Sequence, residues 1–240
     1  MNEVAARPAI THLTRFILRC SLAGAIVLLP GLIAGAAESA APAPAPTAPA
    51  AAPPAMQVTG FRDAHWGMIA AEVKAAIRKD FDIPADKVQT TENPSERTTV
   101  LSATVPDLIA GAGTARVSYI LGYTTKKLIQ VTVIWGTPVD PRVKPAEIVV
   151  AANQLRELLM RSGYLPATIR TNVATRNGTV IVFEGQDADK HTTLVELANG
   201  TVPGRLRNGK REATPTVVLQ LSYSLDAHNP DIFRLKKGAF

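Results

Sequence analysis

The chain has 240 residues, of which 46% are hydrophobic and 19% are charged, with 26 Lys and Arg against 20 Asp and Glu. This length supports one or two small lobes, and a net charge of +6 is too dilute to predict nucleic-acid binding. The only cysteine is Cys20. A mature chain without the leader would therefore hold no disulfide and no thiolate nucleophile.

The beginning of the chain has the pattern of an export signal. A basic start that includes Arg7 and Arg19 precedes an apolar run from Ser21 to Ala37, which ends in small residues. The run contains Pro30 and is shorter than the roughly 20 residues of a membrane-spanning helix. We expect residues 1–37 to be a cleaved signal peptide, with an uncleaved inner-membrane anchor as the alternative.

Residues 38–57 form an Ala- and Pro-rich linker. Pro-rich segments are extended, semi-rigid spacers. The order of signal and spacer predicts a domain that is exported to the periplasm or cell envelope and held at some distance from its leader.

Residues 58–136 predict a first α+β unit. Ile69, Val73 and Ile77 recur at helical spacing, with charged residues between them. Four strand-like runs follow, the last two joined by a hairpin turn. The expected strands are Val88–Thr91, Thr98–Val105, Ala115–Leu121 and Leu128–Trp135.

The same order of elements restarts in residues 137–240. Pro145 suits the first position of a helix, Ile148 and Leu159 belong to its apolar stripe, and Gly163 is a natural terminator. The expected strands are Thr168–Thr175, Thr179–Glu184, Thr192–Ala198 and Thr216–Ser224. We predict an α+β fold of two tandem helix-plus-four-strand units, with antiparallel sheets and both helices on one face.

Two family resemblances accompany this layout. Residues 67–73, Gly-Met-Ile-Ala-Ala-Glu-Val, resemble the helix start of the small outer-membrane-assembly lipoproteins of the SmpA/OmlA type. The tandem layout is similar to that of the secreted beta-lactamase-inhibitor protein. Both resemblances imply a non-enzymatic domain that binds another protein. The chain departs from the lipoproteins because Cys20 begins the apolar run instead of following it, and because Ile69 replaces the usual Ser or Thr cap.

Two groups of residues are candidate binding sites. A basic loop without acidic residues suits phosphate or carboxylate groups, with a solvated loop as the alternative. An expected hairpin turn combines an aromatic with two cationic residues, a combination found in interface hot spots. The candidate ligand- or partner-binding residues are Arg205, Arg207, Lys210 and Arg211 of the basic loop, and Tyr123, Lys126 and Lys127 of the turn.

We expect no catalytic set, no metal site and no cofactor. Asp63 and His65 have a spacing in which a carboxylate can orient an imidazole. Asp187, Asp189 and His191 alternate around an expected turn. Neither group lies in a motif that supplies a nucleophile or a complete set of metal ligands.

These observations favour a periplasmic, non-enzymatic protein-interaction module whose partner is an envelope protein. The first alternative is a binder of anionic envelope components, a lipid headgroup or a glycan, through the basic loop. The second is a hydrolase that uses one of the two histidine-containing groups. The tail, residues 232–240, is both apolar and basic, and either packs on the sheet or docks on a partner.

Overall fold

The computed structural model describes residues 54–207, 210–235 and 238, and within residues 201–215 the description is limited to the backbone. The expected signal peptide and most of the expected linker lie outside these residues. In chain order the elements are β1 (Gly60–Phe61), β2 (Ala64–His65), α1 (Ala70–Phe81), η1 (Ala85–Lys87), β3 (Gln89–Glu92), β4 (Thr99–Val105), β5 (Ala115–Leu121), β6 (Leu128–Gly136), α2 (Pro145–Met160), η2 (Pro166–Thr168), β7 (Arg170–Ala174), β8 (Thr179–Gln186), β9 (Thr192–Arg207) and β10 (Lys210–Ser224).

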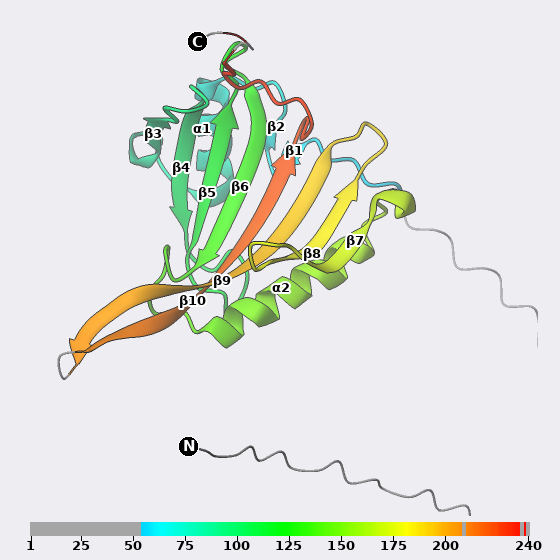
Figure 1. Ribbon diagram of the computed structural model, residues 1–240. Helices are drawn as coiled ribbons and strands as arrows, with labels where there is room; N and C mark the ends of the chain where they lie inside the picture. Colours follow the sequence, from blue (N-terminus) through cyan, green and yellow to red (C-terminus); the bar gives the residue numbers. More distant parts are fainter. Residues whose placement is uncertain (1–53, 208–209, 236–237, 239–240) are drawn as a thin grey trace, which may run out of the picture. The chain divides into compact units, whose positions relative to one another are not determined.

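Eight of the strands form one antiparallel sheet in the order β3-β4-β5-β6-β10-β9-β8-β7, as Figure 1 shows. The strands of residues 58–136 form one side of the sheet, and those of residues 137–240 form the other. The two sides join where β6 pairs with β10, with Val133 opposite Leu221. β1 and β2 form a separate hairpin. The predicted α+β class with antiparallel strands is therefore confirmed.

Both helices begin with the same hydrogen bond, from a backbone N–H to a glutamate side chain. The Ile69 N–H donates to the Glu72 carboxylate at 2.9 Å before α1, and the Lys144 N–H donates to Glu147 at 3.1 Å before α2. A glutamate at the third helical position thus satisfies one amide that the first helical turn leaves free. It supplies a cap at Ile69, a position whose own side chain has no oxygen to offer.

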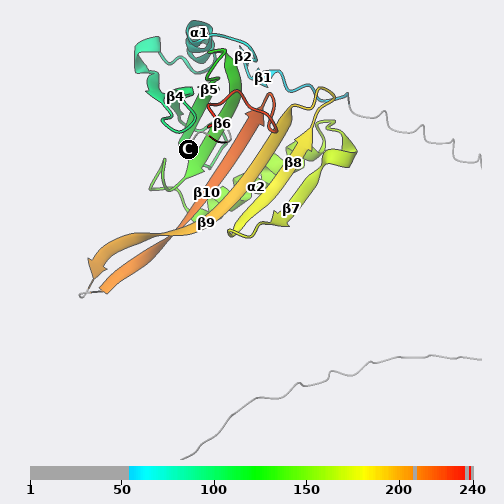
Figure 2. The same ribbon diagram turned by 45° about the horizontal axis from the view of Figure 1, so that its top comes forward.

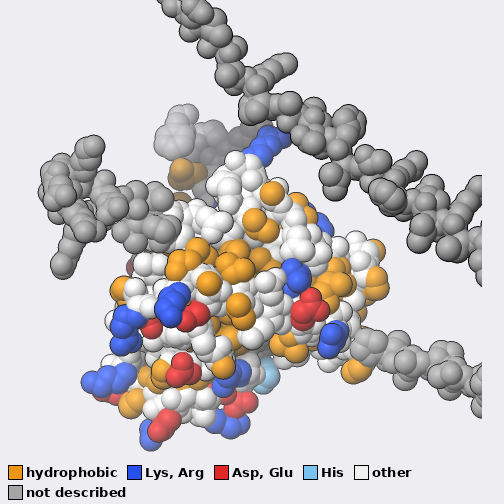
Figure 3. Space-filling view, turned by 90° about the horizontal axis from the view of Figure 1, so that it is seen from below, with side chains coloured by type: hydrophobic (Ala, Val, Ile, Leu, Met, Phe, Trp, Pro, Cys, Tyr) orange, Lys and Arg blue, Asp and Glu red, His pale blue; other side chains and the backbone are white. Residues whose placement is uncertain are grey.

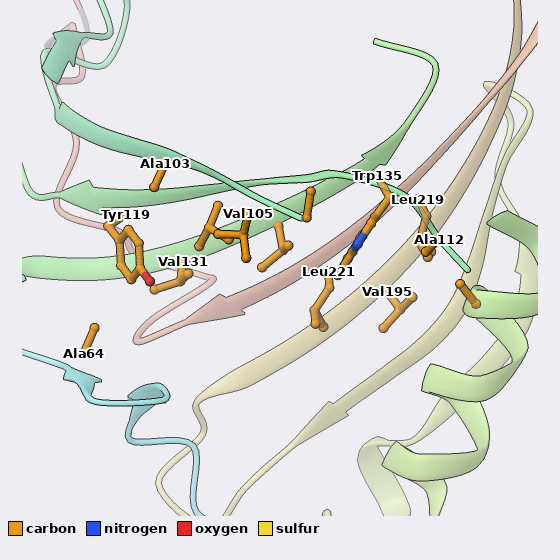
Figure 4. Packing of buried hydrophobic residues seen from close by; sticks show 14 of the residues in the cluster. Ala64, Ala103, Val105, Ala112, Tyr119, Val131, Trp135, Val195, Leu219 and Leu221 are labelled. Carbon is orange, nitrogen blue, oxygen red and sulfur yellow. The ribbon is translucent and has the colours of Figure 1, made fainter. Parts of the chain in front are cut away.

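One hydrophobic core lies between the two helices and one face of the sheet. Val73 and Ile77 of α1 and Ile148 of α2 belong to the same buried cluster as the inward side chains of the strands. Figure 4 shows Trp135 and Leu219, which face each other across β6 and β10, projecting from the same side of the sheet. Figure 2 shows strands β8 to β10 in front of α2, so the helices leave the opposite face of the sheet uncovered.

The segment that precedes β1 contacts the second half of the domain before the chain enters the first half. The Met56 N–H donates to the Gly163 carbonyl at 2.9 Å, and the Val58 N–H donates to the Asp187 carboxylate at 2.8 Å. The Val58 carbonyl then accepts a hydrogen bond from the Trp66 indole at 2.6 Å. These contacts connect the two halves at a second place, away from the β6–β10 pair.

Strands β9 and β10 are longer than predicted. We expected a loop between Ala198 and Thr216, but β9 runs to Arg207 and β10 starts at Lys210. Ala198 is the last residue of β9 that pairs with β8, and the rest pairs with β10 as a two-stranded arm (Figure 1). Pro203 and Gly204 have low strand propensity, but proline is tolerated in strands that lie at an edge.

None of the described helices is long and apolar enough to cross a membrane.

Leu221, which is 4% exposed, lies opposite Val133 at the centre of the sheet. Replacing it by Ala should lower the free energy of unfolding by about 2 to 5 kcal/mol, because the lost side chain leaves a cavity. Urea unfolding measures this loss. Leu158→Ala is the control, since Leu158 is 64% exposed and its truncation should change stability by less than about 0.5 kcal/mol. Equal losses in both variants would contradict the assignment of Leu221 to the core.

Candidate functional site

One row of residues crosses all eight strands on the uncovered face, and we call it the central row. Each of its members lies directly opposite the next one in the neighbouring strand, so their side chains point to the same side. In spatial order the central row is Gln89, Ser102, Ser118, Thr132, Ser222, Leu194, Glu184 and Arg170. Ser102 stands between Leu101 and Ala103, which both point into the core, and this alternation places the row on the face away from the helices.

Small hydroxyl side chains fill the middle of the central row. The Ser102 and Ser118 hydroxyls are 3.1 Å apart, and those of Thr132 and Ser222 are 3.4 Å apart. Thr132 is only 9% exposed and Ser222 only 5%, although nothing among the described elements covers this face as the helices cover the other. The centre of the sheet is therefore lined by small, closely spaced hydroxyl side chains.

Two glutamines extend this hydroxyl network along the strands. The side-chain amide of Gln130 donates to the Thr132 hydroxyl at 3.1 Å, and that of Gln220 donates to Ser222 at 3.2 Å. Half-buried Ile134 lies beside them on the same face. The centre of the face thus combines hydrogen-bonded, uncharged polar groups with an aliphatic side chain, and half-buried Glu196 of β9 lies directly opposite Gln220.

The predicted basic loop is not a loop. Arg205 and Arg207 belong to β9, and Lys210 and Arg211 belong to β10, on both sides of the end of the arm. The side chains of these four residues lie outside the described part of the chain. Their role in anion binding stays a prediction.

Tyr123, Lys126 and Lys127 lie in the turn between β5 and β6, as expected. Tyr123 packs edge-on against Phe233 of the C-terminal tail, with ring centroids 5.5 Å apart. Lys126 and Lys127 are exposed. One of the three residues of the predicted contact patch, Tyr123, is therefore used within the chain, where it packs against the tail.

The described part of the tail packs on the end of the sheet. The Phe233 N–H donates to the Glu96 carbonyl at 2.8 Å, and the Arg97 guanidinium lies 3.9 Å from the centre of the Phe233 ring. Asp231 accepts hydrogen bonds from both the backbone and the hydroxyl of Thr125 and from the Thr124 N–H. Of the two alternatives for the tail, Ile232 and Phe233 follow the first, whereas Leu235 is 63% exposed.

Asp63 and His65 do not form the pair that hydrolysis would need. The Asp63 carboxylate lies 2.5 Å from the Lys79 ammonium, and this hydrogen bond raises the pKa of Lys79. The His65 side chain is exposed. Asp63 therefore ties the β1–β2 hairpin to α1 instead of orienting an imidazole.

Asp187, Asp189 and His191 do come together, with ligand atoms within 4.8 Å of one another. Asp187 is nevertheless 2% exposed, and each of its oxygens already accepts two hydrogen bonds. One of these donors is Nδ1 of His191, at 3.0 Å, and another is the Val58 N–H. The geometry is that of a structural clamp on the entering segment.

A second exposed feature is the outer side of α2. Val150, Leu158 and Met160 are 55%, 64% and 47% exposed. Figure 3, seen from below, shows hydrophobic side chains in the middle of the view with charged ones around them. Asn153 and Glu157 separate the apolar residues along the helix. Because these polar residues interrupt the apolar ones along the helix, we regard the uncovered face of the sheet as the candidate site.

Comparisons with protein-family models, with curated proteins and with solved structures found no match. The two family resemblances therefore stay predictions.

Partial burial would raise the pKa of Asp231, but the hydrogen bonds from Thr125 and Thr124 outweigh it and lower the pKa to about 2 from an ordinary 3.8. The charged carboxylate thus contributes stability above about pH 4, and this contribution is lost as the pH falls toward 2. Asp231→Asn should reduce the free energy of unfolding at pH 7 by about 1 kcal/mol, because the site is partly solvated.

Urea midpoints measured from pH 2 to pH 7 test this. The wild-type curve should fall more steeply than that of Asp231→Asn between about pH 4 and pH 2. Asp86→Asn, at an exposed position in η1, controls for the loss of one negative charge. Parallel curves for the wild type and Asp231→Asn would refute the role of this carboxylate.

Proposed function

We propose that the protein is an exported, non-enzymatic module that binds a folded partner protein on the uncovered face of its sheet. The observation that carries this proposal is the central row, which crosses all eight strands without a covering helix. The leader over residues 1–37 supports a periplasmic or envelope location and a partner in the same compartment. Two observations argue against a hydrolase. Asp63 pairs with Lys79 and not with His65, and both oxygens of Asp187 are already fully hydrogen-bonded.

The size of this face matches a protein partner. Eight strands about 4.8 Å apart span roughly 34 Å, and five to seven residues along each central strand give a length of roughly 20 Å. The resulting area of about 700 Å² is close to the ~800 Å² that each partner buries in a standard protein complex. A small ligand would use only a fraction of it.

The distribution of charge on the face also suits a protein interface. The middle of the central row, from Ser102 to Leu194, holds no charged residue. Charges lie outside this stretch of the row. Arg116 on β5 and Glu196 on β9 stand in the adjacent row on the same face, and Arg170 pairs with Glu184 at 3.1 Å at the far end. Interfaces typically have a core that is poor in charge and a polar, charged rim. We infer that the partner presents a similarly uncharged surface to the middle of the central row.

We also infer that the two halves are tandem units of one design. From the outer edge to the centre, β3 to β6 and β7 to β10 have the same order. Ala-Glu-Val at 71–73 and Ala-Glu-Ile at 146–148 start the two helices, with Val73 and Ile148 both fully buried. Ile-Pro-Ala at 83–85 and Leu-Pro-Ala at 165–167 follow them. A doubled unit explains how one chain builds so wide a face.

Ser118→Lys should abolish binding of the partner, because a long cation in the uncharged centre obstructs contact and must be desolvated there. In-cell crosslinking and pull-down of the tagged full chain, read by quantitative mass spectrometry, measures the loss. The matched control is Asn153→Lys, which adds the same charge on the exposed side of α2.

The free energy of unfolding of both variants should stay within about 1 kcal/mol of the wild-type value. A crosslinked protein that is retained by Asn153→Lys and lost at least tenfold by Ser118→Lys supports the proposal. A partner whose recovery is the same in both variants binds elsewhere, and would refute the assignment of this face.

A further inference from the structure

A pocket of about 320 Å³ opens at one end of the central row, beside edge strand β3. Gln89 and Ser102 belong to that row, and Thr104 and Arg116 lie next to it on β4 and β5. The pocket volume is that of a site for a small molecule. The residues that line it are Asp82, Ile83, Pro84, Lys87, Gln89, Ser102, Thr104 and Arg116.

The lining carries more cationic than anionic groups. Arg116 and Lys87 contribute two positive charges, against one negative charge from Asp82. Neither cation forms an ion pair with the residues that the structure describes. Arginine presents a fork of donors that matches a carboxylate or phosphate. The hydroxyls of Ser102 and Thr104 add further donors on the same wall.

The opposite end of the central row offers an internal comparison. There Arg170 on the outer strand is neutralised by Glu184 at 3.1 Å. The neighbouring Gln186 is also engaged, since its backbone N–H donates to Thr168 at 2.9 Å and its side chain donates to Thr192 at 3.2 Å. At the β3 end the corresponding places in the row are Gln89 and Ser102, which bring no carboxylate to Arg116. At one end the cation is therefore paired within the chain. At the other end, Arg116 and Lys87 line a pocket without an ion pair among the described residues.

We propose that this pocket binds a small ligand through a carboxylate or phosphate group held by Arg116 and Lys87. Ile83 and Pro84 form an apolar wall against which a short hydrocarbon part of the ligand packs. Asp82 disfavours a second negative group on its side of the pocket. The site adjoins the uncharged middle of the central row at Ser102, but Arg116 and Lys87 lie outside that middle, so ligand binding can be tested without the partner proposed above.

Titration of the isotope-labelled full chain with three probes, followed by NMR, tests the site. Glutarate carries carboxylates on a short hydrocarbon, inorganic phosphate carries only the oxyanion, and glutaramide is the neutral analogue of glutarate. Saturable shifts of the Lys87, Gln89 and Thr104 amides are expected with glutarate or phosphate and not with glutaramide. The tighter of the two anions shows which kind of group the pocket takes.

Arg116→Gln should weaken binding of the anion at least tenfold while leaving the unfolding midpoint unchanged. Arg170→Gln is the matched control, because Arg170 lies at the closed end of the same row and should affect binding less than twofold. Three results would overturn the site. These are no saturable shift with either anion, shifts with glutaramide as large as those with glutarate, or binding of the anion by Arg116→Gln as tight as by the wild type. None of them would affect the test with Ser118→Lys.

Discussion

The pairing of β6 with β10 is the constraint on which the rest of the fold depends. Each half alone would be a four-stranded meander with a bare inner edge, and such edges expose unpaired N–H and C=O groups. Joining them satisfies both edges and brings Trp135, at 1% exposure, against Leu219 in a shared core. The central row exists only in the joined sheet, because Thr132 and Ser222 come from opposite sides of the junction. The candidate site is thus a product of this long-range pairing.

A second set of hydrogen bonds also connects the two halves. The entering segment donates from Val58 to Asp187 and receives the Trp66 indole at its own carbonyl. Asp187 is buried, and a buried carboxylate is tolerated only when its oxygens are fully hydrogen-bonded. His191 completes that set. Residues whose types suggested catalysis or cation binding therefore serve to anchor the start of the first half on the second.

Local signals predicted the elements well and their assembly less well. The predicted strand Ala115–Leu121 and the helix start at Pro145 agree with the structure, since hydrophobic period and proline position act within a few residues. The arm formed by β9 and β10 was missed because Pro203 and Gly204 contradict strand propensity. The central row was missed for a different reason. Ser102, like every other member, is simply a polar residue that alternates with core residues, and only the register across eight strands aligns them.

The two ends of the central row differ in charge, and the proposed tandem units give this difference a basis. In the proposed two-fold arrangement, positions such as Gln89 and Arg170 occupy similar places at opposite edges of the sheet. A single carboxylate decides their chemistry, because Glu184 neutralises the cation at one end, whereas Ser102 stands at the matching place at the other. The core cannot diverge so freely, since volume changes there cost several kcal/mol. Functional difference between the halves is therefore expected on the uncovered face, where the substitutions that create it leave the packing intact.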